Sequence, residues 1–506
     1  MKAPEAIHIR RFSQAAFLLI FLALFLTARD PLQKIIPPDL LLRLDPLAGL
    51  TAMIARREII AAFWPALIVL AGTYILGRSF CGWVCPLGTS LDIWNRILPH
   101  GRRRGRRAWK YALLFAIVLL GVLSLQAVWL MDPLVIFNRS LTLALYPLSV
   151  WGGNGILGAT YAWRLTEGIG TFFWNALQGW FLSAQPWQSA LLTTTMIIFI
   201  GILLLEQYGR RYWCRVLCPL GALLGLLARF SPFGRRVNET CTSCSLCGEK
   251  CRMDAIEEDF TRTRRGECIL CLECQTLCVP QATTYRWGWQ AGGQERFDLG
   301  RRRALGTLSA AIVIGGVWRT SLANRAEDGY LIRPPGAVAE DKFLDLCLRC
   351  QECVKACSST GKCLQPSAWE SGWDRLWTPR AHMREGYCEY ACTLCGQVCP
   401  SGAIKPLTEE AKKRKVIGLA YVDRSRCIPW ERGEDCIVCE EHCPTPRKAI
   451  QFRLGDVELP GGLKTGVKLP YVDRNLCIGC GICETRCPVQ GESAVRVTRE
   501  GEQREA

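Results

Sequence analysis

Histidine is scarce in this chain of 506 residues, and that scarcity excludes haem. The sequence has no Cys-x-x-Cys-His pentapeptide, and its few histidines, none in an apolar run, are His8, His100, His382 and His442. Haem b between membrane helices takes histidine ligands from apolar segments, and haem c is attached through that pentapeptide. A glycine-rich phosphate loop and a Ser/His/Asp constellation are also missing, so bond-making chemistry on a large substrate is not expected.

Cysteine, by contrast, is abundant, with 29 residues. Regular runs with the spacing Cys-x2-Cys-x2-Cys-x3-Cys recur, and further runs lengthen the first gap. The spacing is typical of 4Fe–4S clusters, in which three thiolates of a run hold one cluster and the fourth holds its neighbour. Disulfide scaffolds are short secreted chains and zinc ribbons pair cysteines two by two, so neither fits. The regular runs are Cys241–Cys251, Cys268–Cys278, Cys347–Cys357 and Cys477–Cys487, and the lengthened ones are Cys388–Cys399 and Cys427–Cys443.

The net charge of +17 does not indicate nucleic-acid binding. Arginines gather at the ends of apolar segments, as at Arg10-Arg11, Arg102–Arg107 and Arg235-Arg236, without alternating aromatics. This arrangement is typical of the cytoplasmic flanks of membrane helices. Leu157–Thr160 faintly resembles a covalent flavin attachment site but lacks the preceding Ser or Thr, so we interpret it as an ordinary loop and expect no flavin.

The apolar runs predict an α-helical membrane domain with four to five spans, joined to α+β ferredoxin modules of the bacterial type. Counting basic residues places Arg78–Arg107 and the chain after Glu206 on the cytoplasmic side, and the apolar loop Asp132–Gln188 outside. The simplest interpretation of that outer segment is a set of interfacial helices, and it is also a candidate for quinone contact. The predicted spans are Ala15–Ala28, Ile59–Gly77, Tyr111–Met131 and Ser189–Leu205, with Gly306–Trp318 as the fifth.

Two short repeats follow the second and fourth spans, and each spells Arg-x-aromatic-Cys-x3-Cys-Pro-Leu-Gly. They begin at Arg78 and Arg211. Because residues i and i+4 share one face of a helix, each repeat presents two sulfurs to one side, and its proline marks a break. Three interpretations stay open: an additional redox site of four thiolates, a thiol/disulfide pair, or reduced cysteines packed at helix ends. The cysteines are Cys81, Cys85, Cys214 and Cys218.

The predicted order of domains is a membrane domain (1–235), a cytoplasmic two-cluster ferredoxin (236–290), a twin-arginine-like signal or anchor (296–320), a linker (321–341) and a four-cluster ferredoxin domain (342–500). Export through the twin-arginine signal at Gly300–Leu305 suits a domain that must cross the membrane already folded around its clusters. Short strands are expected at Ala449–Phe452 and Ala494–Val497. In the two-cluster module the swapped pattern groups Cys241, Cys244, Cys247 with Cys278, and Cys268, Cys271, Cys274 with Cys251.

These motifs resemble two protein families. Residues 1–290, with Arg43–Leu47, both Cys-Pro motifs and the eight-cysteine module, are similar to the NapH-type membrane iron–sulfur proteins. Residues 296–497, with the twin arginine, Arg333–Gly336 and the Cys347 run, resemble the NapG/MauM ferredoxins. The chain therefore looks like a fusion of two subunits that are usually separate.

The resemblance implies a membrane-bound quinol dehydrogenase that oxidises menaquinol or ubiquinol and passes electrons through six 4Fe–4S clusters to a redox partner outside the cytoplasmic membrane. It also implies a nested pairing of the last four runs. The implied groups are Cys347, Cys350, Cys353 and Cys487; Cys357, Cys477, Cys480 and Cys483; Cys388, Cys392, Cys395 and Cys443; and Cys399, Cys427, Cys436 and Cys439. Cys363 matches nothing in this pattern and is expected to be structural.

The rival interpretation is a maturation factor that supplies reducing equivalents to an exported metalloenzyme. It would use the same clusters without steady turnover. Whether the chain is itself a catalyst, which residues bind quinone and which way electrons flow are left open by the sequence.

Overall fold

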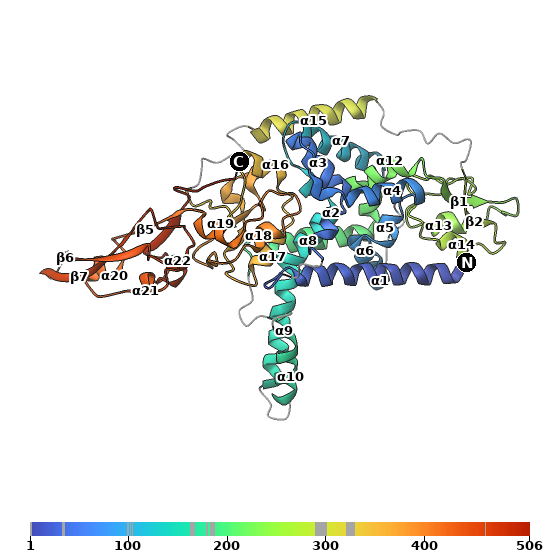
Figure 1. Ribbon diagram of the computed structural model, residues 1–506. Coiled ribbons are helices and arrows are strands. Elements are labelled where there is room, and N and C mark those ends of the chain that lie inside the picture. The colour runs from blue at the N-terminus through green and yellow to red at the C-terminus, as the bar shows by residue number, and fades with distance from the viewer. Residues whose placement is uncertain are drawn as a thin grey trace. The chain divides into compact units, whose positions relative to one another are not determined.

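The computed structural model describes residues 3–32, 36–98, 101, 103, 105–161, 167–178, 181–182, 188–288, 301–319, 329–460 and 462–505. His100, Arg102, Arg104, Gly300 and the linker residues 320–328 lie outside the described part. The chain forms two compact units (Figure 1). The first contains residues 1–27, 35–145 and 193–317, and the second contains 28–34, 146–192 and 318–506.

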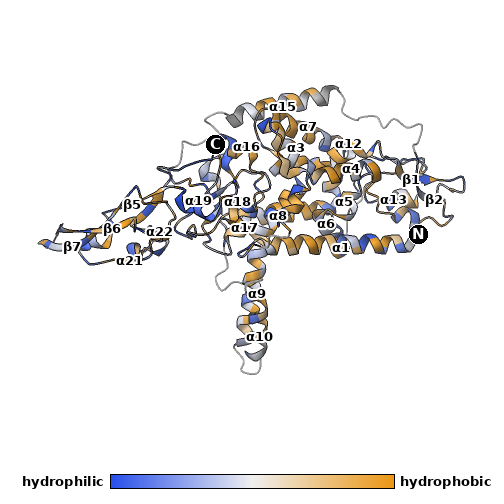
Figure 2. Cartoon of the chain, viewed as in Figure 1, coloured by the Kyte–Doolittle hydropathy of each residue, from blue (hydrophilic) through white to orange (hydrophobic). Residues whose placement is uncertain are grey.

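The first unit is mainly helical, and apolar residues dominate its helices (Figure 2). Prolines begin several of them, because a proline at the first position needs no backbone donor and has the right φ. The helices are α1 (Ala3–Thr27), α2 (Leu40–Arg43), α3 (Pro46–Arg56), α4 (Ala66–Leu76), α5 (Ser79–Trp83), α6 (Pro86–Ile97), α7 (Ala108–Val122), α8 (Pro133–Ser140), α11 (Leu192–Leu204), α12 (Pro219–Ala228) and α15 (Arg301–Arg319), with short turns η1 (Ala61–Phe63), η2 (Val128–Leu130) and η4 (Leu205–Gln207) and π-helices η3 (Leu141–Leu145) and η5 (Trp213–Leu217).

Two helical stretches in the described residues are long and apolar enough to cross a membrane, Glu5–Thr27 and Pro133–Tyr161. The four to five predicted spans are not shown, because the other apolar helices have only 10–17 residues. The predicted span Tyr111–Met131 ends at Val122, where Ser124 takes a positive φ. The described part of 132–188 is largely helical. Leu157–Thr160, interpreted above as an ordinary loop, instead lies inside α9 (Tyr146–Tyr161), because charge-poor apolar residues can also form helix.

The two-cluster module belongs to the first unit. Its ends pair as antiparallel strands, β1 (Phe233–Val237) and β2 (Thr283–Trp287), in the register Arg235 opposite Tyr285. Between them, the short helices α13 (Leu246–Glu249) and α14 (Glu273–Thr276) begin within the cysteine runs. The strand pair therefore closes a small unit around eight cysteines.

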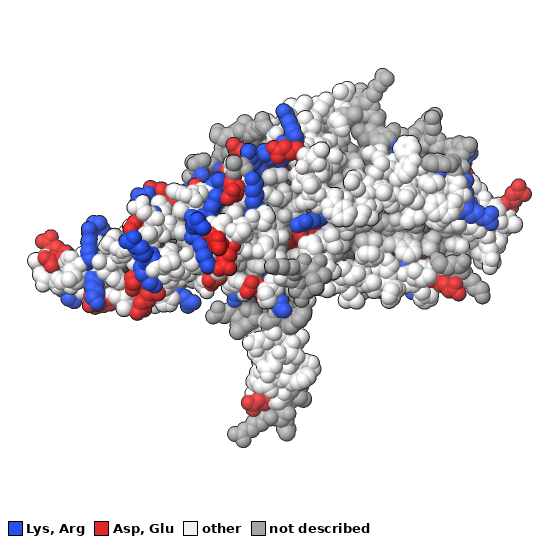
Figure 3. All heavy atoms as spheres, viewed as in Figure 1, with Lys and Arg blue, Asp and Glu red and all other residues white. Residues whose placement is uncertain are grey.

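The second unit is built from short elements, and charged side chains crowd the visible surface of its C-terminal part (Figure 3). Strands occur where predicted: β6 (Ile450–Leu459) pairs with β7 (Gly462–Val472), and β8 (Val495–Thr498) with β5 (Leu419–Val422). The remaining elements are α9, α10 (Glu167–Leu177), α16 (Glu340–Leu346), α17 (Glu352–Cys357), η6 (Trp369–Ser371), η7 (Trp373–Arg375), α18 (Leu394–Gln397), α19 (Glu409–Arg414), α20 (Ile428–Arg432), α21 (Val438–Glu441), α22 (Ile482–Arg486) and the strand pair β3 (Leu364–Pro366) and β4 (Pro379–Ala381).

Residues 329–341, predicted as the end of a linker, are an integral part of this unit. Arg333 is fully buried, and its guanidinium donates to the Glu340 carboxylate at 2.6 and 3.1 Å and lies 4.6 Å from the centre of the Phe343 ring. Ala337 pairs with Ile404, and Val338 with Glu505. The linker prediction is wrong here because a Pro-Pro-Gly turn in a polar segment can also anchor a buried arginine.

Candidate iron–sulfur sites

The four regular cysteine runs share one backbone conformation. In each, the residues on both sides of the second cysteine have positive φ: Ser243 and Ser245, Leu270 and Leu272, Arg349 and Gln351, and Gly479 and Gly481. Six of these eight are not glycine, and non-glycine residues persist in this region only where the surroundings require it. Such turns direct successive N–H groups into a concave nest, a form that iron–sulfur sites use. Backbone N–H groups donate to cluster cysteines, as Leu270 does to Cys268 and Arg349 to Cys347.

In the second unit, each trio of cysteines shares a small cavity with one cysteine from a neighbouring run. The groups are Cys347, Cys350, Cys353 and Cys399; Cys388, Cys392, Cys395 and Cys357; Cys427, Cys436, Cys439 and Cys487; and Cys477, Cys480, Cys483 and Cys443. This arrangement differs from the nested pairing expected above, in which Cys487 joins Cys347 and Cys399 joins Cys427. Instead, the first and second runs exchange their last cysteines with each other, and so do the third and fourth runs.

The exchange follows chain proximity. The last cysteine of the first run ends α17, and the strand pair β3–β4 lies between the first and second runs, whereas β6–β7 lies between the third and fourth. Short local connections bring neighbouring runs together at little cost in loop-closure entropy. The nested pairing would need a run to reach its partner across two intervening runs.

In the two-cluster module, the predicted partner Cys251 is a near neighbour of Cys268 and Cys271. Burial and the neighbouring thiols Cys274 and Cys251 raise the pKa of Cys268 to about 12, and burial, Cys251 and Cys274 also raise the pKa of Cys271. Cys251 therefore lies among Cys268, Cys271 and Cys274. Like charges this close disfavour free thiolates, so such a group is held ionised by a bound metal centre.

The donor sets fit 4Fe–4S clusters on the chemistry of the cysteines and their surroundings. All 29 cysteines lie in the described residues, and none forms a disulfide. Backbone N–H groups approach the sulfurs at 3.3–3.4 Å, from Ala255 to Cys251, Ile404 to Cys399, and Ala494 to Cys487. Hydrogen bonds to sulfur are one of the factors that set cluster potentials. When bound, the clusters supply one-electron transfer.

Cys363, expected to be only structural, lies in the same cavity as Cys357 and Cys388. Its side chain is 2 % exposed, and its Sγ is 3.9 Å from Cys357 Sγ. A hydrogen bond from Cys363 lowers the pKa of Cys388 to about 6, with help from the ammonium of Lys412. The pKa of Cys363 itself is raised well above its usual value because it donates to both neighbours. Cys363 is therefore placed to donate hydrogen bonds to two expected cluster ligands, Cys357 and Cys388.

The two Cys-Pro motifs come together in the first unit. All four cysteines are buried, and Cys85 and Cys218 each precede a helix that begins at proline, α6 and α12. Burial and the thiols of Cys214, Cys81 and Cys85 raise the pKa of Cys218 well above its usual value. In the described residues no three His, Cys, Asp or Glu side chains are placed to hold a single metal ion, so the three interpretations of these cysteines given above all stay open.

The arginines of the two motifs cross over, each lying against the glycine of the other motif. Arg211 Nη2 donates to Gly88 O at 3.1 Å, and Arg78 Nη2 lies 2.6 Å from the position that a Cβ on Gly221 would take. Both guanidinium groups are fully buried. Arg211 also binds Asp92 on α6 through Nε at 2.9 Å and Nη2 at 2.7 Å. Burial alone would raise the pKa of Asp92, but Arg211 and Arg252 hold it far below its usual range.

Sequence reasoning missed a second feature of the repeat, a pair of buried aspartates. Asp45 caps α3 and Asp132 caps α8, each through one carboxylate oxygen that accepts from two backbone N–H groups. The other oxygen of each carboxylate is buried and has no hydrogen-bond partner among the described residues. The sequence contains a sign of this pair, because the tripeptide Asp-Pro-Leu occurs at 45–47 and again at 132–134.

The fold and these sites define a ferredoxin-type iron–sulfur protein that transfers electrons. A family model described as a 4Fe-4S binding domain matches residues 59–107 and 191–238, the halves that carry the two Cys-Pro motifs, and a second 4Fe-4S binding domain matches residues 470–490.

Similar proteins identify the family within this class. The methylamine utilization ferredoxin-type protein MauM of Methylobacillus flagellatus is 31% identical over 188 residues, 37% of this chain and 76% of the relative. The ferredoxin-type protein NapG of Escherichia coli is 32% identical over 210 residues, 40% of this chain and 85% of the relative. The chain therefore belongs to the NapG/MauM ferredoxin-type family. The putative electron transport protein YccM of Escherichia coli is 26% identical over 269 residues, 49% of this chain and 63% of the relative. No solved structure matches.

Proposed function

We propose that this protein is a membrane-bound quinol dehydrogenase component, a NapH-type half fused to a NapG/MauM-type half, that passes electrons from quinol through six 4Fe–4S clusters to an extracytoplasmic redox partner. Chains of such clusters are suited to one-electron transfer. Among the described residues, the apolar helices supply the membrane contact, and the cysteine groups supply the ligands.

One observation carries the proposal: a cluster loop is docked rigidly onto the apolar helices. Arg78 Nη1 donates to Gly266 O at 3.0 Å and to the Glu267 carboxylate at 3.1 Å, and Lys110 on α7 contacts the same carboxylate. Trp83 Nε1 donates to Leu270 O at 3.1 Å. These contacts hold the loop that leads into Cys268 and Cys271 against helices α5 and α7.

The contact between this cluster loop and helices α5 and α7, called the dock below, is buried and closely packed. Glu267 is 4 % exposed, and although burial would raise its pKa, Lys110 and Arg78 lower it. Gly82 on α5 lies so close to the loop that a Cβ there would collide with the Ile269 carbonyl oxygen. A buried, paired carboxylate with glycine at the contact fixes geometry, because removing one partner leaves an uncompensated charge. A lipid-soluble donor held among these helices would meet a cluster at a fixed position.

The experiment is anaerobic reduction of the purified protein by a menaquinol or ubiquinol analogue, followed by electron paramagnetic resonance. Rapid reduction of clusters in both units supports the dehydrogenase. Slow, substoichiometric reduction would contradict it and would favour the maturation factor. An alkaline phosphatase fusion at the C-terminus tests export of the four-cluster unit, and an inactive fusion would place that unit in the cytoplasm.

A further inference from the structure

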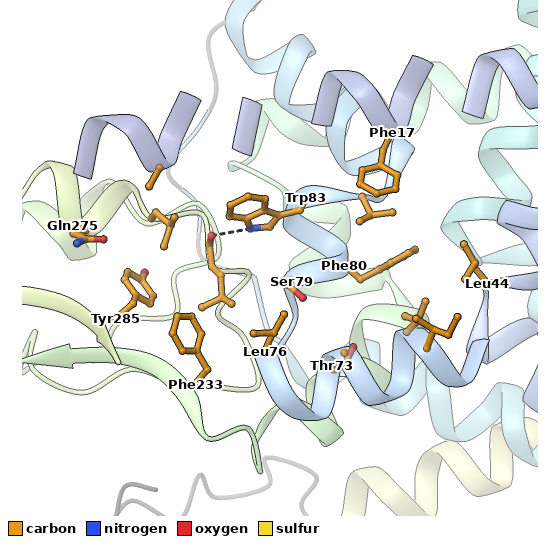
Figure 4. A pocket seen from close by; sticks show the side chains of 17 residues that line it. Phe17, Leu44, Thr73, Leu76, Ser79, Phe80, Trp83, Phe233, Gln275 and Tyr285 are labelled. Atoms are coloured by element: carbon orange, nitrogen blue, oxygen red, sulfur yellow. Dashed lines mark hydrogen bonds between the residues drawn. The ribbon is translucent and has the colours of Figure 1, made fainter. Parts of the chain in front are cut away.

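An elongated cavity of about 680 Å³ lies in the first unit, between the docked cluster loop and the apolar helices (Figure 4). Its wall is formed by α1, α4, α5, the strands β1 and β2, and the loop at Leu270–Leu272. Small-molecule sites typically have 300–1,000 Å³ and a mostly apolar lining with a few polar groups. This cavity fits that description.

A few polar groups line the cavity. Figure 4 shows Gln275 and Tyr285 near one end, Ser79 in the middle and Thr73, on α4, further along, with the aromatic rings of Phe233, Trp83 and Phe80 also in the lining. Thr73 is 1 % exposed, and its hydroxyl has no hydrogen-bond partner among the residues that the structure describes. A buried hydroxyl without a partner is unfavourable, so a ligand that carries an acceptor for it would be bound with a gain.

The cavity is adjacent to cluster ligands. Leu270 and Leu272, which line it, flank Cys271, and the Tyr285 hydroxyl lies 3.1 Å from Cys274 Sγ. A molecule in the cavity therefore lies against the loop whose cysteines form the Cys251–Cys274 group.

The opposite wall faces an apolar surface. Ile68 and Leu76 line the cavity and are 58 % and 38 % exposed, and their neighbours on α4, Leu67 and Ile75, are 64 % and 44 % exposed. An uncharged helix face of this kind is suited to lipid and admits a ligand that is dissolved in it.

We propose that this cavity is the quinone-binding site, in which a ring carbonyl accepts a hydrogen bond from the Thr73 hydroxyl and the apolar walls hold the ring and its chain. The assignment rests on the proposed quinol function. It replaces the loop Asp132–Gln188 as the site of quinone contact.

The test measures binding of 2-heptyl-4-hydroxyquinoline N-oxide, a quinol analogue whose fluorescence is quenched when it binds, to the full chain in detergent. Gly72→Leu fills the cavity, since nothing lies within 4 Å of a Cβ there. Gly201→Leu is the matched control, because Gly201 on α11 has equally open space and does not line the cavity. Thr73→Val removes the hydroxyl, and Thr195→Val removes an equally buried, unpartnered hydroxyl elsewhere.

We expect one bound probe per chain, weakened at least about tenfold by Gly72→Leu and roughly fivefold by Thr73→Val, with both controls like wild type. Iron content equal to wild type establishes that each variant is folded. Absence of binding to the wild type, equal weakening by the controls, or equally effective competition by decanol, which lacks a ring, would overturn the site. If probe binding follows this pattern but quinol reduces no cluster, the proposed function fails and the binding site stands; if quinol reduction continues at the wild-type rate in Gly72→Leu, the site fails and the function stands.

Discussion

At the scale of single residues, Cys363 tunes one cluster site without belonging to its four ligands. Hydrogen bonds donated to cluster sulfur stabilise the more negative, reduced state and so raise the potential. Cys363→Ala should lower the midpoint potential of the cluster at Cys357 and Cys388 by roughly 40 mV, about 1 kcal/mol for one electron.

Cys363→Ser is the matched variant, because its hydroxyl can still donate. Potentiometric titration followed by electron paramagnetic resonance should show one cluster shifted in the alanine variant and little change in the serine variant. An unchanged potential in Cys363→Ala would refute the tuning role.

Glu340 makes the stability of the second unit depend on pH. Burial alone would raise its pKa, but Arg333, Arg504 and Arg375 lower it to about 2. In the unfolded chain the pKa of a glutamate is about 4.3. The interaction of Glu340 with its arginines therefore stabilises the folded unit above that pH, and this stabilisation is lost as the pH falls from about 4.3 to about 2. The shift corresponds to about 3 kcal/mol at neutral pH.

Glu340→Gln should therefore lower the free energy of unfolding of this unit at pH 7, and its difference from wild type should shrink below about pH 4. Urea unfolding followed by loss of cluster absorbance measures this difference. Glu370→Gln is the control, since Glu370 pairs with Arg380 at the surface with 55 % of its side chain exposed. A pH-independent difference for Glu340→Gln would contradict the account.

Residue identity alone predicted the cluster cysteines, because their spacing is a direct consequence of the cluster's shape. It did not predict the positive φ at Leu270, Arg349 and Gln351, since these residue types rarely adopt it and only the fold imposes it. Thr73 was equally hidden: a threonine in an apolar run gives no sign of whether its hydroxyl bonds to its own helix or is left without a partner.

At the scale of elements, the contact between α5 and the cluster loop is the most sensitive feature. Gly82→Ala places a Cβ against the Ile269 carbonyl and should destabilise the dock by about 1–3 kcal/mol. Limited proteolysis should then cut the module, residues 236–288, faster than in wild type. Gly201→Ala, with nothing within 4 Å of its Cβ, should behave as wild type, and equal protection of both variants would show that the dock is not tight.

Element positions were predicted unevenly. The strands at Ile450 and Val495 were correct in place, because they follow cysteine runs in an alternating pattern. The ends of the helices were not predicted correctly, since apolar composition does not distinguish a spanning helix from one packed within the protein. The nested pairing failed because a resemblance in spacing carries no information on which runs are neighbours in space.

At the scale of the whole molecule, the grouping of cysteines determines which cluster each substitution removes. Cys399→Ser should destroy the cluster of Cys347, Cys350 and Cys353 and leave the one at Cys427, Cys436 and Cys439. Cys487→Ser should do the reverse. Iron analysis and electron paramagnetic resonance of the two variants distinguish this grouping from the nested one, in which the two losses are exchanged. Zinc in place of iron, or far fewer than about two dozen irons in the wild type, would contradict the six-cluster account.

The contacts of Arg78 and Arg211 with the glycine of the other motif limit how the first unit can have evolved. Each copy of the repeat places its guanidinium against the glycine of the other, and the Arg211 charge is paired with Asp92, which follows the first copy. A one-copy ancestor could have made both contacts only as a symmetric homodimer. Gene duplication and fusion would then have freed the halves to diverge, and here only one of them borders the cavity at Thr73.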